Sequence, residues 1–237
     1  MNFRQRSYEK ERMDAPDLHP SEFHNNLKEI VLINRYLGGA SVTVQGINAL
    51  VKAHDLQDLH ITDIGSGAGD IFPYLDKKLH QYSPHFTAVD IQSEAQTYLE
   101  KHYPAYKDKV DWIIDDYNRV FEKENATDIV TASLFCHHLN DEELVDFLRG
   151  AVRYARVGVV INDLHRHPFA YHSIRLLTKW FSNSAFTKHD APLSVRRGFT
   201  ASEWSEYLSE AEITNASITW KWAFRHLVVI PTNNQLL

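Results

Sequence analysis

The chain has 237 residues, of which 43% are hydrophobic and 24% charged, and its formal net charge is −6. These values are typical of a folded globular protein, and the lack of a long Lys/Arg run argues against a nucleic-acid partner. No stretch approaches the ~20 apolar residues that span a bilayer, and the single cysteine excludes an intrachain disulfide. The first residues carry no secretory-signal pattern, so we expect a cytoplasmic protein with no membrane partner.

Short apolar runs alternate with helical patterns along most of the chain, which predicts an α/β fold with a parallel sheet flanked by helices. The predicted strands cover residues 60–65, 85–91, 110–115, 127–133, 156–163, 216–222 and 224–230. The predicted helices cover residues 70–81, 93–102, 141–154 and 201–211. We expect Thr200 or Ser202 to cap the last helix.

The first 55 residues fall outside this alternation. They contain a helical pattern over residues 27–37, in which Asn34 interrupts an otherwise apolar face before two glycines end the helix. We therefore predict that residues 1–55 form an N-terminal helical cap on a domain of residues 56–237.

A second segment, residues 164–198, separates the fifth predicted strand from the last helix and strands. A helix is expected after Pro168, followed by a loop over residues 188–199. Together with the N-terminal cap, this insert is large enough to form a lid over the carboxyl ends of the strands.

A glycine loop follows the first predicted strand. The segment ITDIGSGAGDIF (61–72) runs from a strand through Gly65, Gly67 and Gly69 into a helix. Glycines allow positive φ and let a ligand approach the backbone, and open α/β sheets bind ligands at this end of the strands. Asp90, at the end of the second strand, can accept hydrogen bonds from both hydroxyls of a ribose. The pattern therefore predicts a site for an adenosine cofactor.

The acidic residues of the loop bear on which cofactor it binds. The glycine spacing is G-x-G-x-G rather than the G-x-G-x-x-G of dinucleotide sites, and Asp70 takes the place of the last glycine. Asp63 adds a second carboxylate. These charges disfavour a pyrophosphate and favour a ligand that carries an ammonium and a sulfonium group.

From residue 58 to residue 163 the chain resembles the class I S-adenosylmethionine-dependent methyltransferases. The resemblance implies a Rossmann-like, seven-stranded, mostly parallel sheet with helices on both faces. It also implies S-adenosylmethionine as the cofactor and S-adenosylhomocysteine as the product. In such enzymes a segment like DIGSGAGD holds the methionine part of the cofactor, and the acid that matches Asp90 holds the ribose.

Other segments extend the resemblance. IIDDY (113–117) matches the motif in which an acid contacts the adenine amino group, a role for Asp116 or alternatively Asp115, while Tyr117 or Ile91 would pack against the ring. The fourth strand would end beside the transferred methyl. The implied cofactor-binding residues are Asp63, Gly65, Gly67, Gly69, Asp90, Ile91, Asp115, Asp116, Tyr117 and Ser133.

More narrowly, the chain resembles the methyltransferases that bacteria encode beside type III polyketide synthases. The shared segments are ERMDAPDL, INRYLGG, the double histidine after the fourth strand, NDLHRH and HDAPLSVRRGFT. This resemblance implies a small aromatic or polyketide-like acceptor, and we expect O-methylation of its phenolic or enolic hydroxyl by a monomer or homodimer. The alternatives are C-methylation of a similar molecule, methylation of RNA or protein, an NAD-dependent oxidoreductase, or a cofactor-binding protein without activity.

Histidines are the candidate catalytic residues. His137 and His138 follow the fourth strand, and an imidazole suits removal of a proton from a phenol or enol. We favour His138 as the general base, with His137 and His189 as the other candidates. Cys136 is expected to be a packing residue, because methyl transfer from a sulfonium needs no covalent enzyme intermediate.

The remaining predictions concern metal and substrate. A metal site could draw on His137, His138, His165, His167 and His189. The spacing matches no zinc pattern and only one cysteine is present, so we expect no metal. In the insert, Phe169 is a candidate for the substrate wall. Arg166 and Arg197 are candidates for orienting an acceptor oxygen, or alternatively for ion pairs that hold the insert against the core.

Overall fold

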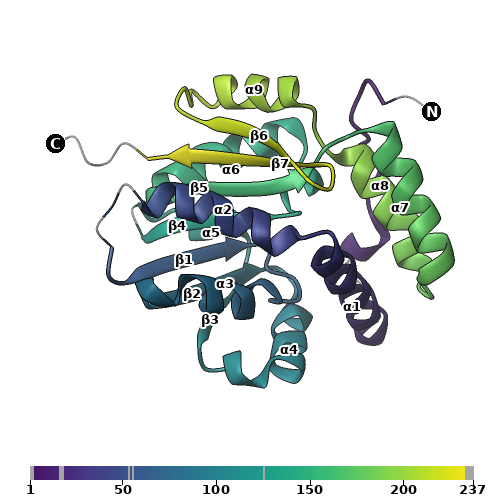
Figure 1. Cartoon of the computed structure of the whole chain (residues 1–237), viewed down its shortest axis with the longest axis horizontal. Helices are drawn as coiled ribbons and strands as arrows, with labels where there is room; N and C mark the ends of the chain where they lie inside the picture. The colour runs from purple at the N-terminus through teal and green to yellow at the C-terminus, as the bar shows by residue number, and fades with distance from the viewer. Residues whose placement is uncertain (1–2, 16–18, 53, 55, 125, 233–237) are drawn as a thin grey trace.

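A computed structural model describes residues 3–15, 19–52, 54, 56–124 and 126–232. Seven strands form one sheet in the order β3-β2-β1-β4-β5-β7-β6, in which β7 is antiparallel to both of its neighbours and the other pairs are parallel (Figure 1). The strands are β1 (Leu59–Ile64), β2 (Pro84–Asp90), β3 (Val110–Ile114), β4 (Thr127–Ser133), β5 (Ala155–Leu164), β6 (Ser217–Lys221) and β7 (Arg225–Pro231). Every predicted strand is confirmed within one residue at each end, and so is the predicted Rossmann-like fold.

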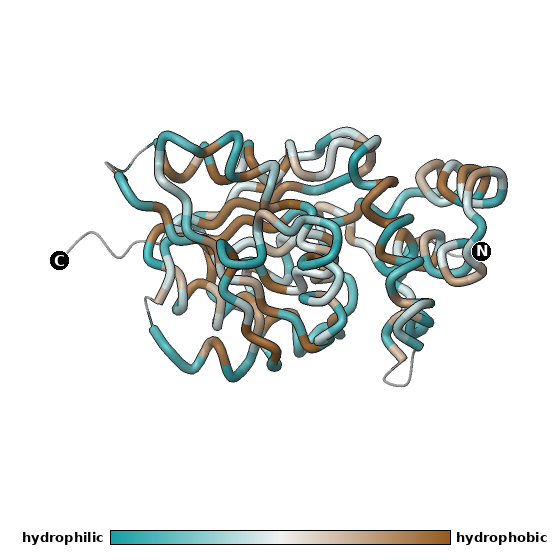
Figure 2. The backbone as a smooth tube through the Cα atoms, turned by 90° about the horizontal axis from the view of Figure 1, so that it is seen from below, coloured by the Kyte–Doolittle hydropathy of each residue, from teal (hydrophilic) through white to brown (hydrophobic). Residues whose placement is uncertain are grey.

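Helices cover both faces of the sheet. They are α1 (Pro20–Tyr36), α2 (Gly39–Val51), α3 (Ile71–Leu79), α4 (Ser93–His102), α5 (Tyr117–Val120), α6 (Asp141–Tyr154), α7 (Pro168–Phe181), α8 (Ala185–Arg197) and α9 (Ala201–Glu210). One hydrophobic cluster joins α2, α3 and α4 to one face, and a second joins α6 and α9 to the other. Figure 2 shows the hydrophobic strands at the centre between these layers. None of the helices in the described residues is long and apolar enough to cross a membrane.

Two helices differ from the sequence-based expectation. Helix α2 was not predicted, and it packs against the sheet, where Gly46 lies against Val160 and Leu227. This part of residues 1–55 therefore belongs to the core, and only the segment before it lies over the strand ends. Residues 188–199 were expected to form a loop, but α8 includes most of them and carries Pro192 inside the helix.

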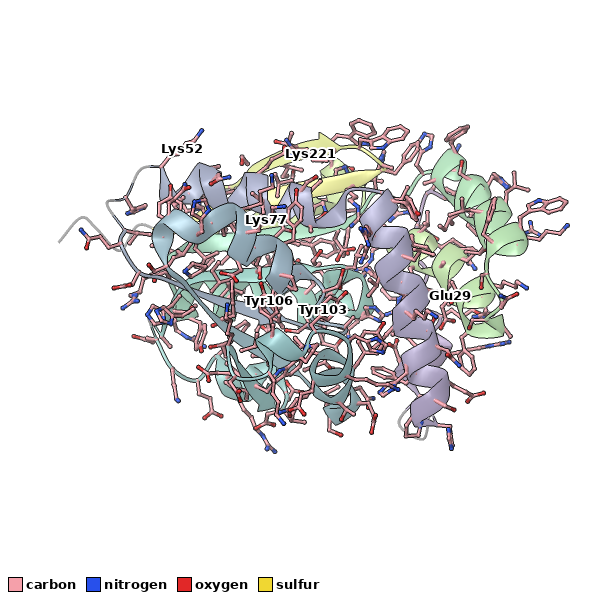
Figure 3. All side chains as sticks on the ribbon, turned by 60° about the horizontal axis from the view of Figure 1, so that its bottom comes forward. Glu29, Lys52, Lys77, Tyr103, Tyr106 and Lys221 are labelled. Atoms are coloured by element: carbon pink, nitrogen blue, oxygen red, sulfur yellow. The ribbon has the colours of Figure 1, made fainter. Side chains whose placement is uncertain are left out.

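The helices that do not cover the sheet faces gather at its end. Figure 1 shows α1, α7 and α8 together beyond the carboxyl ends of β1 and β5. Glu29 of α1, labelled in Figure 3, links them, because its carboxylate accepts hydrogen bonds from Ser182 Oγ at 2.5 Å and from the backbone N–H of Asn183 at 3.0 Å, in the α7–α8 connection. The two segments that were predicted to form a lid thus contact each other directly.

Candidate active site

A cavity of about 600 Å³ lies between the carboxyl ends of the strands and the helices α1, α7 and α8. It falls within the size range of small-molecule sites. Most of the residues singled out from the sequence line it, namely Asp63, Gly65, Gly67, Asp90, Ile91, Asp115, Asp116, Tyr117, Ser133, His137, His138 and Phe169. Gly69, Arg166, His189 and Arg197 are not on its wall.

The glycine loop needs its glycines. Gly65, Gly67 and Gly69 have φ of 66°, 51° and 63°, in the left-handed region that other residues rarely adopt. At Gly65 a Cβ would also overlap the ring of Phe135, and at Gly69 it would overlap the side chain of Leu99. Gly69 therefore lets the loop pack closely against Leu99, whereas Gly65 and Gly67 line the cavity.

Asp90 holds the loop and keeps acceptor capacity for a ligand. Its Oδ2 accepts the backbone N–H of Gly67 at 2.8 Å, and its Oδ1 accepts that of Gln92 at 2.9 Å. Each carboxylate oxygen has a second lone pair, so a diol can still donate to both. The next residue, Ile91, is 70% exposed on the cavity wall, an apolar surface suited to a flat ring.

Buried carboxylates surround the loop. Burial raises the pKa of Asp63 to about 7; the hydrogen bonds from Thr131 and Ser66 oppose this shift, and the charges of Asp70 and Asp90 add to it. Burial also raises the pKa of Asp70 to about 6. A cationic ligand would relieve this repulsion, as the sequence predicted for an ammonium and a sulfonium.

The segment after β3 also faces the cavity. Asp116 caps α5 by accepting the N–H of Asn118 at 2.8 Å, and Asp115 pairs with Arg119 at 3.3 Å. The Tyr117 ring packs edge-on against Phe135 with centroids 5.5 Å apart. Both carboxylates retain unused lone pairs toward the cavity, so the choice between them as the adenine contact stays a prediction.

The exit of β4 has an unusual backbone. Leu134 has a φ of 55°, a conformation that costs about 1–3 kcal/mol for a residue other than glycine. It turns the chain into a short 3₁₀ helix, Cys136–His138, that places both histidines on the cavity wall. Cys136 is completely buried, and burial raises the pKa of its thiol well above the usual value, as expected of a packing residue.

His137 is oriented by a carboxylate. Its Nδ1–H donates to Asp163 Oδ1 at 2.7 Å, and its backbone N–H donates to Asp163 Oδ2 at 3.2 Å. Burial would raise the pKa of Asp163, but the charge and hydrogen bond of His137 outweigh burial and hold that pKa below its usual value. The other ring nitrogen of His137, Nε2, is not used by Asp163 and lies 3.6 Å from Glu11 Oε1.

His138 has a different environment. Its Nδ1 lies 3.1 Å from Asp14, and Glu11 lies nearby. Burial would lower the pKa of His138, but the charges of Glu11 and Asp14 and the hydrogen bond to Asp14 raise it to about 9. At neutral pH this imidazole is therefore mostly protonated, which disfavours it as a proton acceptor.

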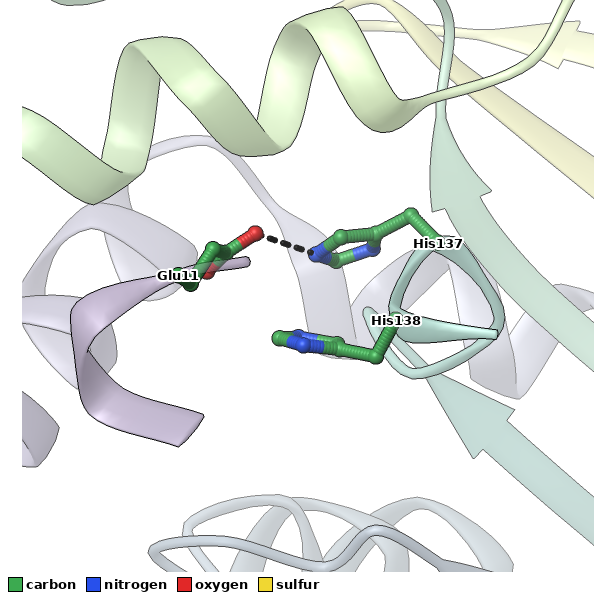
Figure 4. Close-up of side chains that lie close together, drawn as sticks. All are labelled: Glu11, His137 and His138. Carbon is green, nitrogen blue, oxygen red and sulfur yellow. Dashed lines mark ion pairs between the residues drawn. The ribbon is translucent and has the colours of Figure 1, made fainter. Parts of the chain in front are cut away.

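Figure 4 shows Glu11, His137 and His138 facing one another. Each offers one ligand atom, and these atoms lie within 4.8 Å of one another, so a metal ion could bind here. Arg197 Nε lies 3.9 Å from the same Glu11 oxygen and supplies a positive charge that a metal would have to oppose. The expectation of no metal stays a prediction.

The two arginines predicted to contact substrate do something else. Arg166 donates to Glu203 and to the backbone oxygen of Gly198 at 2.6 Å. Arg197 donates to the backbone oxygens of His137 at 2.9 Å and His138 at 2.8 Å. Buried guanidinium groups need such partners, and these bonds turn both side chains away from the cavity. The prediction that they orient substrate is not supported by this geometry; they position the helix and loop around the site.

Other contacts escaped the sequence analysis. Glu11 and Asp14 come from the N-terminal segment, which Arg6 anchors through the backbone oxygens of Leu139 at 2.9 Å and Arg197 at 3.0 Å. His189 points to Asp190 at 2.8 Å, beside rather than on the wall. The sequence singled out Glu11 and Asp14 only as part of the segment ERMDAPDL and predicted no role for either residue.

Comparison with known proteins agrees with this geometry. Residues 61–158 match the family model of a methyltransferase domain. A search of curated proteins found no significant match. Among solved structures, an S-adenosylmethionine-dependent methyltransferase from Aquifex aeolicus superposes with a TM-score of 0.62 at 18% identity, over 91% of this chain and 100% of that one.

Two further structures are longer than this chain. An O-methyltransferase family protein from Burkholderia thailandensis has a TM-score of 0.63 at 12% identity, over 88% of this chain and 59% of that one. Human N-acetylserotonin methyltransferase, in complex with S-adenosylmethionine, has a TM-score of 0.57 at 18% identity, over 90% of this chain and 56% of that one. Residues 61–158 thus match a methyltransferase domain, and the fold agrees with that of solved S-adenosylmethionine-dependent methyltransferases.

Proposed function

We propose that this methyltransferase domain transfers the methyl group of S-adenosylmethionine to a phenolic or enolic hydroxyl of a small aromatic or polyketide-like molecule. The observation that carries the proposal is the His137–Asp163 pair, 2.7 Å apart, whose histidine lies on the wall of the cavity that the glycine loop and Asp90 also line. A base with a fixed tautomer beside a cofactor site is the arrangement that proton removal during O-methylation needs.

The cavity contains groups that suit each part of the cofactor. Asp63 and the backbone of Gly65 and Gly67 would hold the methionine part, Asp90 would hold the ribose, and Ile91 would cover the adenine. When bound, the cofactor supplies an electrophilic methyl group. The protein then needs only to orient the acceptor in line with it and to take up the released proton.

We assign that proton to Nε2 of His137. Asp163 holds the ring through Nδ1, so Nε2 carries the lone pair, and the buried carboxylate stabilises the imidazolium that forms. The sequence favoured His138 instead. Its raised pKa makes it a cation at neutral pH, better suited to stabilise a developing negative charge than to accept a proton.

The acceptor is proposed to be small. Helices α1, α7 and α8 roof the cavity, and Phe169, Ile174 and Leu177 of α7 contribute apolar side chains to its wall. An enclosed apolar wall favours a small aromatic ring over a bulky RNA or protein. C-methylation of a ring activated by its own hydroxyl would use the same base, and it is the second candidate.

The test is a methylation screen. Purified protein with S-adenosylmethionine is incubated with a panel of phenols, resorcinols and pyrones, and each product is read by mass spectrometry for a gain of one methyl group. Fragmentation distinguishes an O-methyl from a C-methyl product. Tight NAD binding together with no binding of S-adenosylhomocysteine would contradict the proposal and point to an oxidoreductase.

A further inference from the structure

Arg225, the first residue of β7, is a buried cation that forms no ion pair with a described residue. Burial lowers its pKa to about 10, and the charge of Asp163 opposes this shift only in part. Its side chain is 2% exposed and ranks among the largest fully buried side chains of the described residues. The arginines in ion pairs are Arg6, Arg119, Arg149, Arg156, Arg166, Arg196 and Arg197, and none of the ion pairs in the described ranges includes Arg225. A buried charge that is not paired is costly, so its presence needs an explanation.

The hydrogen bonds of Arg225 do not explain why its charge is buried without an ion pair. Nη2 donates to Asn34 Oδ1 at 2.8 Å, and Nη1 makes a long bond to Asn162 Oδ1 at 3.5 Å. Nε is buried and has no partner. Two neutral amides thus take part of a donor set that can make five bonds, and part of the guanidinium remains available. Asn34 is the polar residue that interrupts the apolar face of α1.

Arg225 faces the candidate active site. Of the described residues on the cavity wall, it is the single one that carries a guanidinium or ammonium group. The carboxylates on the same wall are Glu11, Asp14, Asp63, Asp70, Asp90, Asp115, Asp116 and Asp190. Protonated His138 also lies on this wall, but Asp14 and Glu11 already balance its charge. An anionic ligand group entering this cavity therefore finds Arg225 as the cation that no carboxylate of the described residues pairs with.

The register of the sheet relates Arg225 to the proposed base. Arg225 pairs with Leu164 across the β5–β7 ladder, one residue after Asp163, which orients His137. Neighbouring residues of a strand point to opposite faces, so Arg225 and His137 approach the cavity from the two sides of the sheet edge. A molecule lying across this edge can contact both.

The cofactor does not explain Arg225. In the strand order β1-β4-β5-β7, Arg225 is three strands away from the glycine loop that follows β1. Three inter-strand spacings of about 4.8 Å amount to roughly 14 Å. Strand spacing therefore favours the acceptor over a methionine carboxylate held at Gly65 and Gly67 as the ligand of Arg225. Nearer to Arg225 are aromatic residues, since Phe224 precedes it and lies 5.8 Å, between ring centroids, from Phe169.

We infer that Arg225 binds a negatively charged oxygen group of the acceptor, a carboxylate or an acidic enolate, while the acceptor ring lies against Phe169 and Phe224. The inference rests on the proposed function, because it assigns the acceptor of that same site. It narrows the acceptor class from phenols in general to phenols or enols that carry an anionic group at the end remote from the methyl donor. The planar guanidinium can hold such a group through two parallel hydrogen bonds.

The test compares 4-fluorobenzoate with its neutral isostere 4-fluorobenzamide, by ¹⁹F NMR titration with and without S-adenosylhomocysteine. We expect the wild type to bind the benzoate at least about tenfold more tightly, because charge-assisted hydrogen bonds favour the anion. Arg225→Gln should bring the ratio close to one, and Arg225→Lys should keep part of the preference. Lys221→Gln is the matched control: Lys221 lies opposite Arg225 on β6, off the cavity wall, and its loss should leave the ratio unchanged.

A second readout measures ligand binding on the wild-type protein itself and uses a variant only to assign the signal. In protein labelled with ¹⁵N-arginine, the Nε–H resonance of Arg225, assigned by its absence in Arg225→Lys, should shift with 4-fluorobenzoate and not with 4-fluorobenzamide. Equal affinity of the wild type for both probes, no binding of the benzoate, or an unchanged ratio in a folded Arg225→Gln variant would overturn the inference.

Cofactor binding separates this inference from the proposed function. Arg225→Gln and Arg225→Lys should bind S-adenosylhomocysteine with wild-type affinity. A loss of that affinity in the variants would assign Arg225 to the cofactor and overturn the inference, with methyl transfer still possible. A wild type that does not bind S-adenosylhomocysteine would count against the proposed function, whatever the probe preference.

Discussion

Asp163 Oδ1 lies 2.7 Å from His137 Nδ1, although 26 residues separate them, and both side chains are almost completely buried. The contact joins the end of β5 to the exit of β4, which are neighbours in the sheet. The adjacent His138 instead faces Asp14 and Glu11, whose charges raise its pKa to about 9 and keep it protonated. The predictions below follow from that asymmetry and from the charges around it.

His137→Gln should lower kcat about 10²–10⁴-fold, the usual contribution of a general base, with little change in S-adenosylmethionine affinity. His138→Gln should have a smaller effect, because a protonated imidazole contributes charge rather than a proton acceptor. Single-turnover methylation of a substrate found in the acceptor screen measures both. A larger loss in His138→Gln than in His137→Gln would restore His138 as the base.

Asp90→Ala should abolish measurable binding of S-adenosylmethionine, since it removes both the ribose acceptor and the bond that holds Gly67. Calorimetry with S-adenosylhomocysteine gives the affinity directly. Asp111→Ala, on the exposed side of β3, is the control and should bind normally. Normal binding by Asp90→Ala would remove this residue from the cofactor site.

The affinity for S-adenosylmethionine should fall as the pH drops below about 7. Burial raises the pKa of Asp63 to about 7, so at lower pH this carboxylate takes up a proton and no longer attracts the cationic ligand. One linked proton weakens binding at most about tenfold per pH unit. Titration calorimetry between pH 5.5 and 8.5 measures the slope.

Asp63→Asn should bind more weakly at pH 8 and should lose the pH dependence in this range. Asp70→Asn is the comparison variant. Burial raises the pKa of Asp70 only to about 6, so this variant should keep the change in affinity near pH 7. A dissociation constant that does not change with pH in the wild type would contradict the assignment of Asp63 as the charged contact.

Protonated His138 should stabilise the fold. Its pKa is raised to about 9 in the folded state, against about 6.5 in an unfolded chain. The stabilisation is therefore fully present below pH 6.5 and is lost as the pH rises to about 9, and it amounts to at most about 3 kcal/mol. Thermal unfolding between pH 6 and 9.5 should show this decline in the wild type and not in His138→Gln.

Removal of divalent metal should leave activity unchanged. The proposed chemistry uses His137, Asp163 and the bound methyl donor, and none of these requires a metal. Activity is compared before and after dialysis against EDTA, with the metal content measured on the same samples. A loss that Mn²⁺, Zn²⁺ or Mg²⁺ restores would instead assign Glu11, His137 and His138 as ligands.

The strands and the glycine loop were predictable because local pattern decides them. Strands buried on both faces, such as β5 with VGVVI (157–161), read as continuous apolar runs, and the conformation of Gly65 permits few other residues. Helix α2 was missed because GASVTVQGINALV is rich in glycine and β-branched residues, and burial on the sheet overrides their low helix propensity. Helix α8 was missed because Pro192 normally ends a helix.

The site was predictable where it follows a strand and not where it depends on distant contacts. Asp63, Asp90 and the two histidines all follow strand ends, so their gathering at one edge follows from the topology. Glu11 and Asp14 reach the histidines across more than 120 residues. The roles of Arg166 and Arg197 depended on which buried carbonyls needed donors, and no sequence pattern records that.

The anchoring of Arg6 has a consequence for biosynthesis. Its partners, the backbone oxygens of Leu139 and Arg197, leave the ribosome more than 130 and 190 residues after it. The segment around Arg6 therefore cannot pack against these partners until most of the protein has been synthesised. Only then can Glu11 and Asp14 reach the histidines, so this side of the cavity is completed late in synthesis.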